Sequence, residues 1–136
     1  MAHALINIDV DDLARATKFY CQAFDLRAGR RFGTEGIELL GGGAPIYLLA
    51  KRAGSRATPA ASDERRYERH WTPVHLDFVV DEIHSAVERA RAAGAQLEVP
   101  VATHRWGHIA LMADPFGHGF CLIQFVGRGY DEIAAA

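Results

Sequence analysis

The stretch that decides the fold is Asp114-Pro115-Phe116-Gly117-His118-Gly119-Phe120-Cys121-Leu122-Ile123-Gln124-Phe125. Asp-Pro followed by Gly at the fourth position predicts a tight turn. Pro fixes φ, Gly accepts a positive φ, and the Asp carboxylate can accept backbone N–H groups ahead of it. The apolar run at 120–125 predicts a buried strand, and a second apolar run at 107–113 ends just before the turn. The whole stretch therefore predicts a β-hairpin.

Outward from this hairpin, strand patterns alternate with helix patterns. Strands are predicted at 5–10, 26–32, 35–40, 46–50, 74–80, 96–101 and 108–113. One helix is predicted from a cap at Asp11 or Asp12 to Phe24, and a second from a cap at Asp81 to Ala93, with Gly94 at the position that ends helices.

Residues 51–73 show no periodicity. Residues 51–62 predict a mobile linker, and the mixed charges of 63–70 predict one helical turn. A connection this long in a compact domain is a linker or a lid, and as a lid it would close over a ligand with Tyr67 and Trp71.

Size and composition narrow the function classes. The chain has 136 residues, which is one domain by length, and its 49% hydrophobic and 24% charged residues are ordinary for a globular protein. A net charge of −2 gives no electrostatic case for nucleic acid or an anionic membrane, and no apolar run is long enough to span a bilayer. The two cysteines, Cys21 and Cys121, make no disulfide framework, so we expect a cytoplasmic protein.

The two halves of the chain repeat one pattern. Shifting the first half by 70 residues places Ile8 on Phe78 and Asp11 on Asp81, and near the end of each half a shift of 74 places Gly43 on Gly117. Each half reads strand, helix, then three strands, which predicts an α+β fold built from two duplicated modules.

These paired halves, together with the Asp-Asp-Leu opening of the first helix, the Ala-Gly end of the second and the Asp114-Pro115 hairpin, resemble the vicinal oxygen chelate superfamily. That superfamily holds glyoxalases, bleomycin-resistance proteins, fosfomycin-resistance enzymes and extradiol dioxygenases. The resemblance implies a single glyoxalase-like domain over 1–136, in which two βαβββ modules in tandem (about 4–50 and 74–126, joined by linker 51–73) form a curved mixed sheet around a ligand trough. It also implies a homodimer.

The resemblance further implies a divalent metal held by one residue in the first and one in the last strand of each half, normally His, Glu or Gln. Carried onto this sequence, those positions are Leu5, Tyr47, His75 and Cys121. His75 is the one usual ligand, and Leu5 has no donor atom. We therefore expect no cofactor, and the alternative is a divalent metal held by an altered set that includes His75.

Polar residues predicted on the strand faces away from the helices are candidates for ligand anchors. These are Asn7, Asp9, His75 and Asp77. The alternative is a partly solvated sheet face, and the two aspartates could instead act as a general base or pair with arginines of the linker. Cys121 with His75 could form a nucleophile and base, or the thiol could simply fill the pocket floor.

Aromatic residues complete the predicted ligand site. Tyr47, Trp106 and Phe125 could stack on a ligand, and His108 could contact it. The main hypothesis is a small-molecule binding protein without the usual metal set. Its rivals are a metal-dependent lyase or dioxygenase with an altered ligand set, and a partner-binding module whose trough is filled by side chains.

Overall fold

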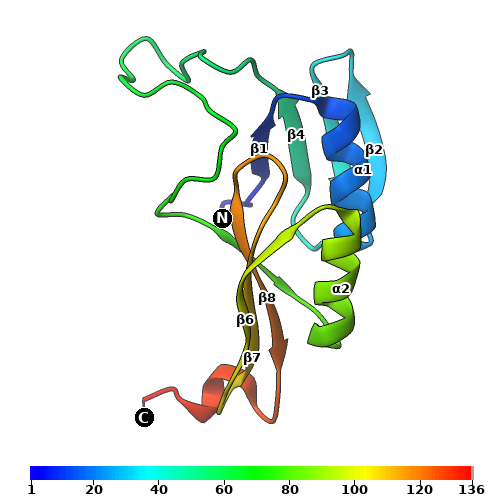
Figure 1. Ribbon diagram of the computed structural model, residues 1–136, viewed down its shortest axis with the longest axis vertical. Helices are drawn as coiled ribbons and strands as arrows, with labels where there is room; N and C mark the ends of the chain where they lie inside the picture. The colour runs from blue at the N-terminus through cyan, green and yellow to red at the C-terminus, as the bar shows by residue number, and fades with distance from the viewer. Residues whose placement is uncertain (136) are drawn as a thin grey trace.

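A computed structural model describes residues 1–135 and shows two similar modules, each a strand and a helix followed by three strands (Figure 1). The first module comprises β1 (Ile6–Val10), α1 (Leu13–Phe24), β2 (Arg27–Phe32), β3 (Gly36–Leu40) and β4 (Ile46–Ala50). The second comprises β5 (Leu76–Val79), α2 (Ile83–Ala93), β6 (Gln96–His104), β7 (Gly107–Ala113) and β8 (Gly119–Phe125), followed by the short 3₁₀ helix Gly129–Glu132.

The predicted α+β architecture of tandem βαβββ modules is confirmed. Each module forms an open four-stranded sheet, ordered β1-β4-β3-β2 in the first and β5-β8-β7-β6 in the second. In both sheets the first strand runs parallel to the last, and the register places Asn7 beside Tyr47 and Asp77 beside Cys121. These two pairs are related by the shifts of 70 and 74 residues found in the sequence, so the repeat extends to the register of the strands.

Both helices lie on the same side of the molecule, and each covers one face of its own sheet (Figure 1). The carboxylate of Asp12 caps α1 by accepting the N–H of Arg15. The predicted cap at Asp81 is wrong by one residue: Glu82 caps α2, with its carboxylate accepting N–H groups of His84 and Ser85. The sequence rule favours Asp over Glu at this position, and here the backbone path places Glu82 at the cap instead.

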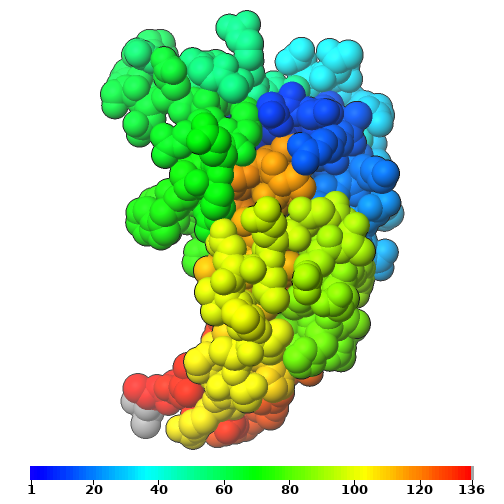
Figure 2. Space-filling view, viewed as in Figure 1, coloured from blue at the N-terminus to red at the C-terminus, as the bar shows by residue number. Residues whose placement is uncertain are grey.

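The turn between β7 and β8 joins the two modules. As the sequence predicted, Asp114 Oδ1 accepts the backbone N–H groups of Phe116 at 2.8 Å and His118 at 2.9 Å. Its Oδ2 accepts the hydroxyl of Tyr20 in α1 at 2.5 Å. Phe116 at the tip is fully buried, and in Figure 2 the turn fills the space between the two modules. The buried carboxylate of Asp114 therefore connects the second module to α1 of the first through its hydrogen bond with Tyr20.

Stacked aromatic rings continue the contact between modules. Phe24 of α1 lies parallel to Phe78 of β5, with ring centroids 3.9 Å apart, and meets Phe120 of β8 edge-on at 5.1 Å. Phe19 packs against Phe116 in the turn. Burial of large aromatic surfaces contributes strongly to stability, so one core runs through both modules.

The linker leaves the helix-free side of the molecule as a looped excursion and then crosses the second module (Figure 1). Backbone hydrogen bonds between Gly54 and Arg65 and between Arg65 and Ser55, each 2.8 Å, close the base of the loop. The helical turn predicted at 63–70 is wrong, because this stretch contains neither helix nor strand.

The path of the linker across the second module explains why Gly117 and Gly119 have no side chain. A Cβ at Gly117 would collide with the backbone carbonyl of Glu68, and one at Gly119 with the guanidinium of Arg69. Arg69 is in turn held by a bidentate ion pair with Glu98 of β6, at 2.8 and 3.1 Å. Small residues in the turn thus let the linker approach the sheet closely.

The C-terminal segment packs against the end of the second module. The 3₁₀ helix Gly129–Glu132 brings the ring of Tyr130 to 5.2 Å from Trp106 and 4.8 Å from Phe125. Strand β6 also extends to His104, beyond the predicted end at 101. Among residues 1–135, no helix is long and apolar enough to cross a bilayer.

Candidate functional site

A crevice of about 480 Å³ separates β1 of the first module from β5 and β8 of the second. Its walls are largely apolar, and its polar side chains come from both modules. The lining residues are Ile6, Asn7, Ile8, Asp9, Tyr20, Thr72, Val74, His75, Leu76, Phe78, His118, Gly119 and Phe120. Three predicted anchors, Asn7, Asp9 and His75, therefore share one cavity although they lie in different modules.

The polar end of this crevice is fixed by contacts with the linker and with the turn after β7. Asp9 forms an ion pair with Arg65 of the linker at 2.8 Å, which is the arginine pairing considered for this aspartate. His118 Nε2 lies 2.7 Å from the carbonyl oxygen of Asp9, and the His118 ring packs edge-on against Tyr67. The turn between β7 and β8 of the second module thus contacts and supports β1 of the first module through His118.

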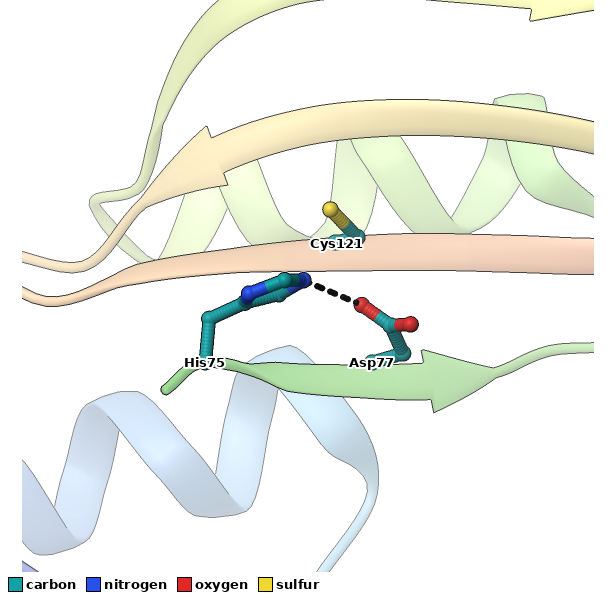
Figure 3. A group of neighbouring side chains, drawn as sticks. All are labelled: His75, Asp77 and Cys121. Atoms are coloured by element: carbon teal, nitrogen blue, oxygen red, sulfur yellow. Dashed lines mark ion pairs between the residues drawn. The ribbon is translucent and has the colours of Figure 1, made fainter. Parts of the chain in front are cut away.

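Next to the crevice, His75, Asp77 and Cys121 form a compact cluster (Figure 3). His75 immediately precedes β5 and Asp77 lies two residues later on the same face, while the parallel register sets Cys121 of β8 beside Asp77. His75 Nε2 and Asp77 Oδ1 are 3.2 Å apart, and the donor atoms of all three residues lie within 4.8 Å of one another.

The environment of Cys121 argues against a nucleophilic thiolate. Burial of the side chain raises the pKa of the Cys121 thiol to about 11, and the nearby negative charge of Asp77 and a hydrogen bond to it act in the same direction. The thiol is therefore protonated at neutral pH, since a thiolate is favoured by cationic or polar surroundings. Without a cation beside it, the cysteine and histidine pair lacks an activated nucleophile.

A smaller cavity of about 240 Å³ opens beside this cluster, on the face away from α2. The linker supplies one of its walls through Arg69, Trp71 and Thr72, and the sheet supplies the other through His75, Leu111, Gly119 and Cys121. Of the two predicted lid residues, Trp71 lines this cavity and Tyr67 does not. Trp71 lines this cavity while 79% exposed, whereas the hydroxyl of Tyr67 donates to the carbonyl oxygen of Lys51 at 2.6 Å.

Tyr47 lies in a different cluster, on the sheet of the first module. Its hydroxyl donates to Glu38 at 2.9 Å and accepts a hydrogen bond from Arg30 at 3.2 Å, while Arg30 forms an ion pair with Glu38 at 2.6 Å. Hydrogen bonds from the side chain and backbone N–H of Arg30 lower the pKa of Glu38 to about 2. We did not single out Glu38 from the sequence, although a lone carboxylate between Ile37 and Leu39 in a strand is the signal that would have found it.

Trp106, His108 and Phe125 lie at the far end of the second module, beside the C-terminal 3₁₀ helix. Trp106 stacks on His104 and packs near Phe125, and His108 Nδ1 is 2.9 Å from the hydroxyl of Thr103. These three predicted ligand residues line neither the crevice nor the smaller cavity. Tyr20, Phe78 and Phe120 supply the aromatic rings of the crevice instead.

The four positions that the resemblance implied for a metal do not fit one. Leu5 is 61% exposed and has no donor atom. The hydroxyl of Tyr47 is already shared between Glu38 and Arg30. A metal spanning both modules at these positions would keep two donors, His75 and Cys121, which is too few for the four-coordinate or octahedral sites that proteins build.

Comparisons with known proteins agree with this architecture. The glyoxalase-like domain family matches residues 5–123. An uncharacterized protein of Mycobacterium tuberculosis is 33% identical over 138 residues, covering 93% of this chain and 77% of that protein.

Solved structures of the same fold include two whose names indicate a function. The fosfomycin resistance protein FosX from Listeria monocytogenes superposes with a TM-score of 0.73 at 20% identity, covering 98% of each chain. A glyoxalase-related enzyme from Fulvimarina pelagi superposes with a TM-score of 0.71 at 21% identity, covering 91% of this chain and 88% of that one.

A variant of the same Listeria protein has been solved with Mn(II) and 1S,2S-dihydroxypropylphosphonic acid, and it superposes with a TM-score of 0.68 at 21% identity, covering 90% of this chain and 88% of that one. At these identities the superpositions establish the fold, while the match over 5–123 establishes the family. The chain therefore belongs to the glyoxalase-like domain family, within the vicinal oxygen chelate superfamily.

Proposed function

We propose that this protein binds a small organic molecule in the crevice between the two modules, without the metal set usual for its superfamily. One observation carries the proposal: the crevice brings Asn7 and Asp9 of one module together with His75 of the other, between apolar walls. Its volume of about 480 Å³ lies within the range of about 300–1,000 Å³ of small-molecule sites, which combine apolar walls with a few polar groups.

The lining indicates the class of ligand. The partly exposed ring of Phe78 offers flat apolar surface beside the almost fully buried Tyr20 and Phe120, and the amide of Asn7 and the imidazole of His75 offer hydrogen bonds. These groups suit a planar or aromatic compound with hydrogen-bonding substituents. Binding of this kind sequesters a compound without changing it covalently.

Thermal unfolding with a panel of aromatic and glycopeptide compounds, on metal-free protein, tests the proposal. At least one compound should raise the midpoint of unfolding, because a ligand that binds the folded chain stabilises it. Its affinity should fall at least about tenfold in Asn7→Leu, which removes an anchor. The matched control, Val79→Ala, alters an exposed residue of β5 outside the crevice and should leave the affinity unchanged. Absence of stabilisation across the panel would contradict the proposal.

A second candidate, a metal-dependent lyase or dioxygenase, is favoured by the cluster of His75, Asp77 and Cys121. A protein of the same fold has been solved with Mn(II), which supports considering a metal site with an altered ligand set in this chain. The cluster holds one histidine, one carboxylate and one thiol, whereas non-haem iron oxygenases use two histidines and one carboxylate. Of the two reactions, the lyase therefore fits the donor set better.

We further propose a cytoplasmic homodimer. The strands β1 and β5 each form one of the two edges of their sheets, and apolar side chains stand exposed on or near them at Leu5, Trp71, Val74 and Val79. Exposed edges and apolar surface support association with a second copy. Both cysteines are free thiols, which supports a reducing compartment.

A further inference from the structure

The cluster of His75, Asp77 and Cys121 has the donor chemistry of a transition-metal site. It offers an imidazole nitrogen, a carboxylate oxygen and a sulfur, all within 4.8 Å of one another. Imidazole and thiolate suit zinc and its neighbours, while magnesium and calcium require mostly oxygen ligands. A borderline divalent cation therefore matches this set better than a hard one.

The spacing also fits a tetrahedral ion. Bonds of about 2.0–2.3 Å place the ligand atoms of such an ion about 3.3–3.8 Å apart. His75 Nε2 and Asp77 Oδ1 are 3.2 Å apart, and the 4.8 Å limit on the cluster leaves about 1 Å of closure for the sulfur. Rotation of the imidazole and carboxylate can supply this closure, because the side chains of His75 and Asp77 are 50% and 40% exposed.

The surrounding charges accept a cation. Arg69 lines the adjoining cavity, but its guanidinium is engaged by Glu98 at 2.8 and 3.1 Å, which compensates its positive charge. His75 and Cys121 both line that cavity of about 240 Å³, so a fourth coordination position would face open space next to Trp71. Three protein ligands with one open position are the arrangement of catalytic rather than structural zinc sites.

We propose that His75, Asp77 and Cys121 bind one divalent cation of the zinc or cobalt class, entirely on the second module. Asp77 supplies the donor that Leu5 and Tyr47 of the first module do not. The site therefore differs from the two-module arrangement implied by the resemblance, and it is separate from the crevice except for the shared His75.

Titration of the metal-free chain with cobalt(II) tests the site, because thiolate-to-cobalt charge transfer absorbs strongly and reports sulfur coordination directly. One equivalent of cobalt should produce this absorption. In Cys121→Ser the absorption should disappear, and in Asp77→Asn the affinity should fall at least about tenfold. Cys21→Ser is the matched control, since Cys21 is the other cysteine and lies in α1; it should behave as the unchanged protein.

Three results would overturn the site: no absorption at stoichiometric cobalt, absorption lost in Cys21→Ser and kept in Cys121→Ser, or an unchanged affinity in Asp77→Asn. Circular dichroism checks the fold of each variant. Asp77 is partly exposed, so its variant remains informative if the buried Cys121→Ser variant unfolds. Asn7→Leu should bind cobalt normally, so failure of the metal site and failure of the ligand crevice are distinguishable.

Discussion

The repeat put different chemistry at equivalent positions of the two modules. Asn7 and Tyr47 correspond to Asp77 and Cys121 in strand register, but Tyr47 points its hydroxyl into an ion pair between Arg30 and Glu38, whereas Cys121 adjoins a histidine. The first module has thereby lost the ability to offer a free donor at this position. The second module retains three donors, and the difference arises from individual side chains on a shared backbone.

Glu38 should make stability depend on acidity. Its folded pKa of about 2 is below the ordinary 4.5. The stabilisation is therefore complete above pH 4.5 and is lost as the pH falls toward 2. Denaturant unfolding at a series of pH values should show a steeper loss over this window in the unchanged protein than in Glu38→Gln. Parallel curves for the two proteins would show that the ion pair with Arg30 is not formed.

The bond between Tyr20 and Asp114 should be among the costliest single hydrogen bonds to remove. Tyr20→Phe leaves a buried carboxylate with one partner fewer, and hydrogen bonds to charged groups contribute about 1.5–3 kcal/mol to the free energy of unfolding. Chemical denaturation measures the loss. Tyr130→Phe, which alters a half-exposed tyrosine at the other end of the chain, should change stability by less than about 0.5 kcal/mol. Equal effects would contradict the assigned role.

At the scale of the elements, the turn after β7 does more than reverse the chain. The linker passes close to this turn at Gly117. Asp114 of the turn accepts a hydrogen bond from α1, and His118 contacts the backbone of β1. At the corresponding Gly43 of the first module, an added Cβ would meet nothing within 4 Å. The duplicated turns therefore share geometry and differ in how closely another segment approaches the equivalent glycine.

This difference can be measured with two equivalent glycines. Gly43 and Gly117 share a φ of 91°, so alanine is strained at both, at about 1–2 kcal/mol. Nothing lies within 4 Å of an added Cβ at Gly43, whereas Glu68 obstructs one at Gly117. Gly117→Ala should therefore lower the free energy of unfolding clearly more than Gly43→Ala in urea denaturation. Equal losses would show that the linker does not cross closely.

The elements were predictable from the sequence because their signals are local. Alternation and apolar spacing located both α-helices and the eight strands of residues 1–135 but missed the 3₁₀ helix Gly129–Glu132, and Gly94 marked the end of α2. The ends of elements were less certain where neighbours were chemically alike, as at Asp81 and Glu82. The helical turn at 63–70 failed because its residues satisfy their contacts with the turn and sheet of the second module rather than with each other.

The site was predictable only in part. Polar residues on the helix-free strand faces followed from strand alternation, and Asn7, Asp9 and His75 of this set line one crevice. Contacts between Tyr20 and Asp114, 94 residues apart, and between Asp9 and His118, 109 residues apart, leave no periodic trace in the chain. Phe125 lies on the same face of β8 as Cys121, and Trp106 lies in the turn between β6 and β7. The length of the second sheet places both at its other end.

At the scale of the whole molecule, the two open sheets predict association. Val74→Asp combined with Val79→Asp introduces charge among the exposed apolar residues near the edge strand β5, and should convert the proposed dimer to a monomer in analytical ultracentrifugation. Ile133→Asp is the matched control, since Ile133 is exposed at the distant C-terminal end and should leave the dimer intact. A monomeric unchanged protein would refute the dimer.

The looped excursion of the linker has a consequence for proteolysis. Arg56 is exposed in this loop, one residue after Ser55, whose carbonyl takes part in the hydrogen bonds that close the base. A single tryptic cut there would sever the only covalent connection between the modules. The hydrogen bond between Tyr20 and Asp114 and the stacking of Phe24 on Phe78 would still hold the modules together. The two fragments should therefore co-elute as one native particle, and separately produced halves should reassemble when mixed.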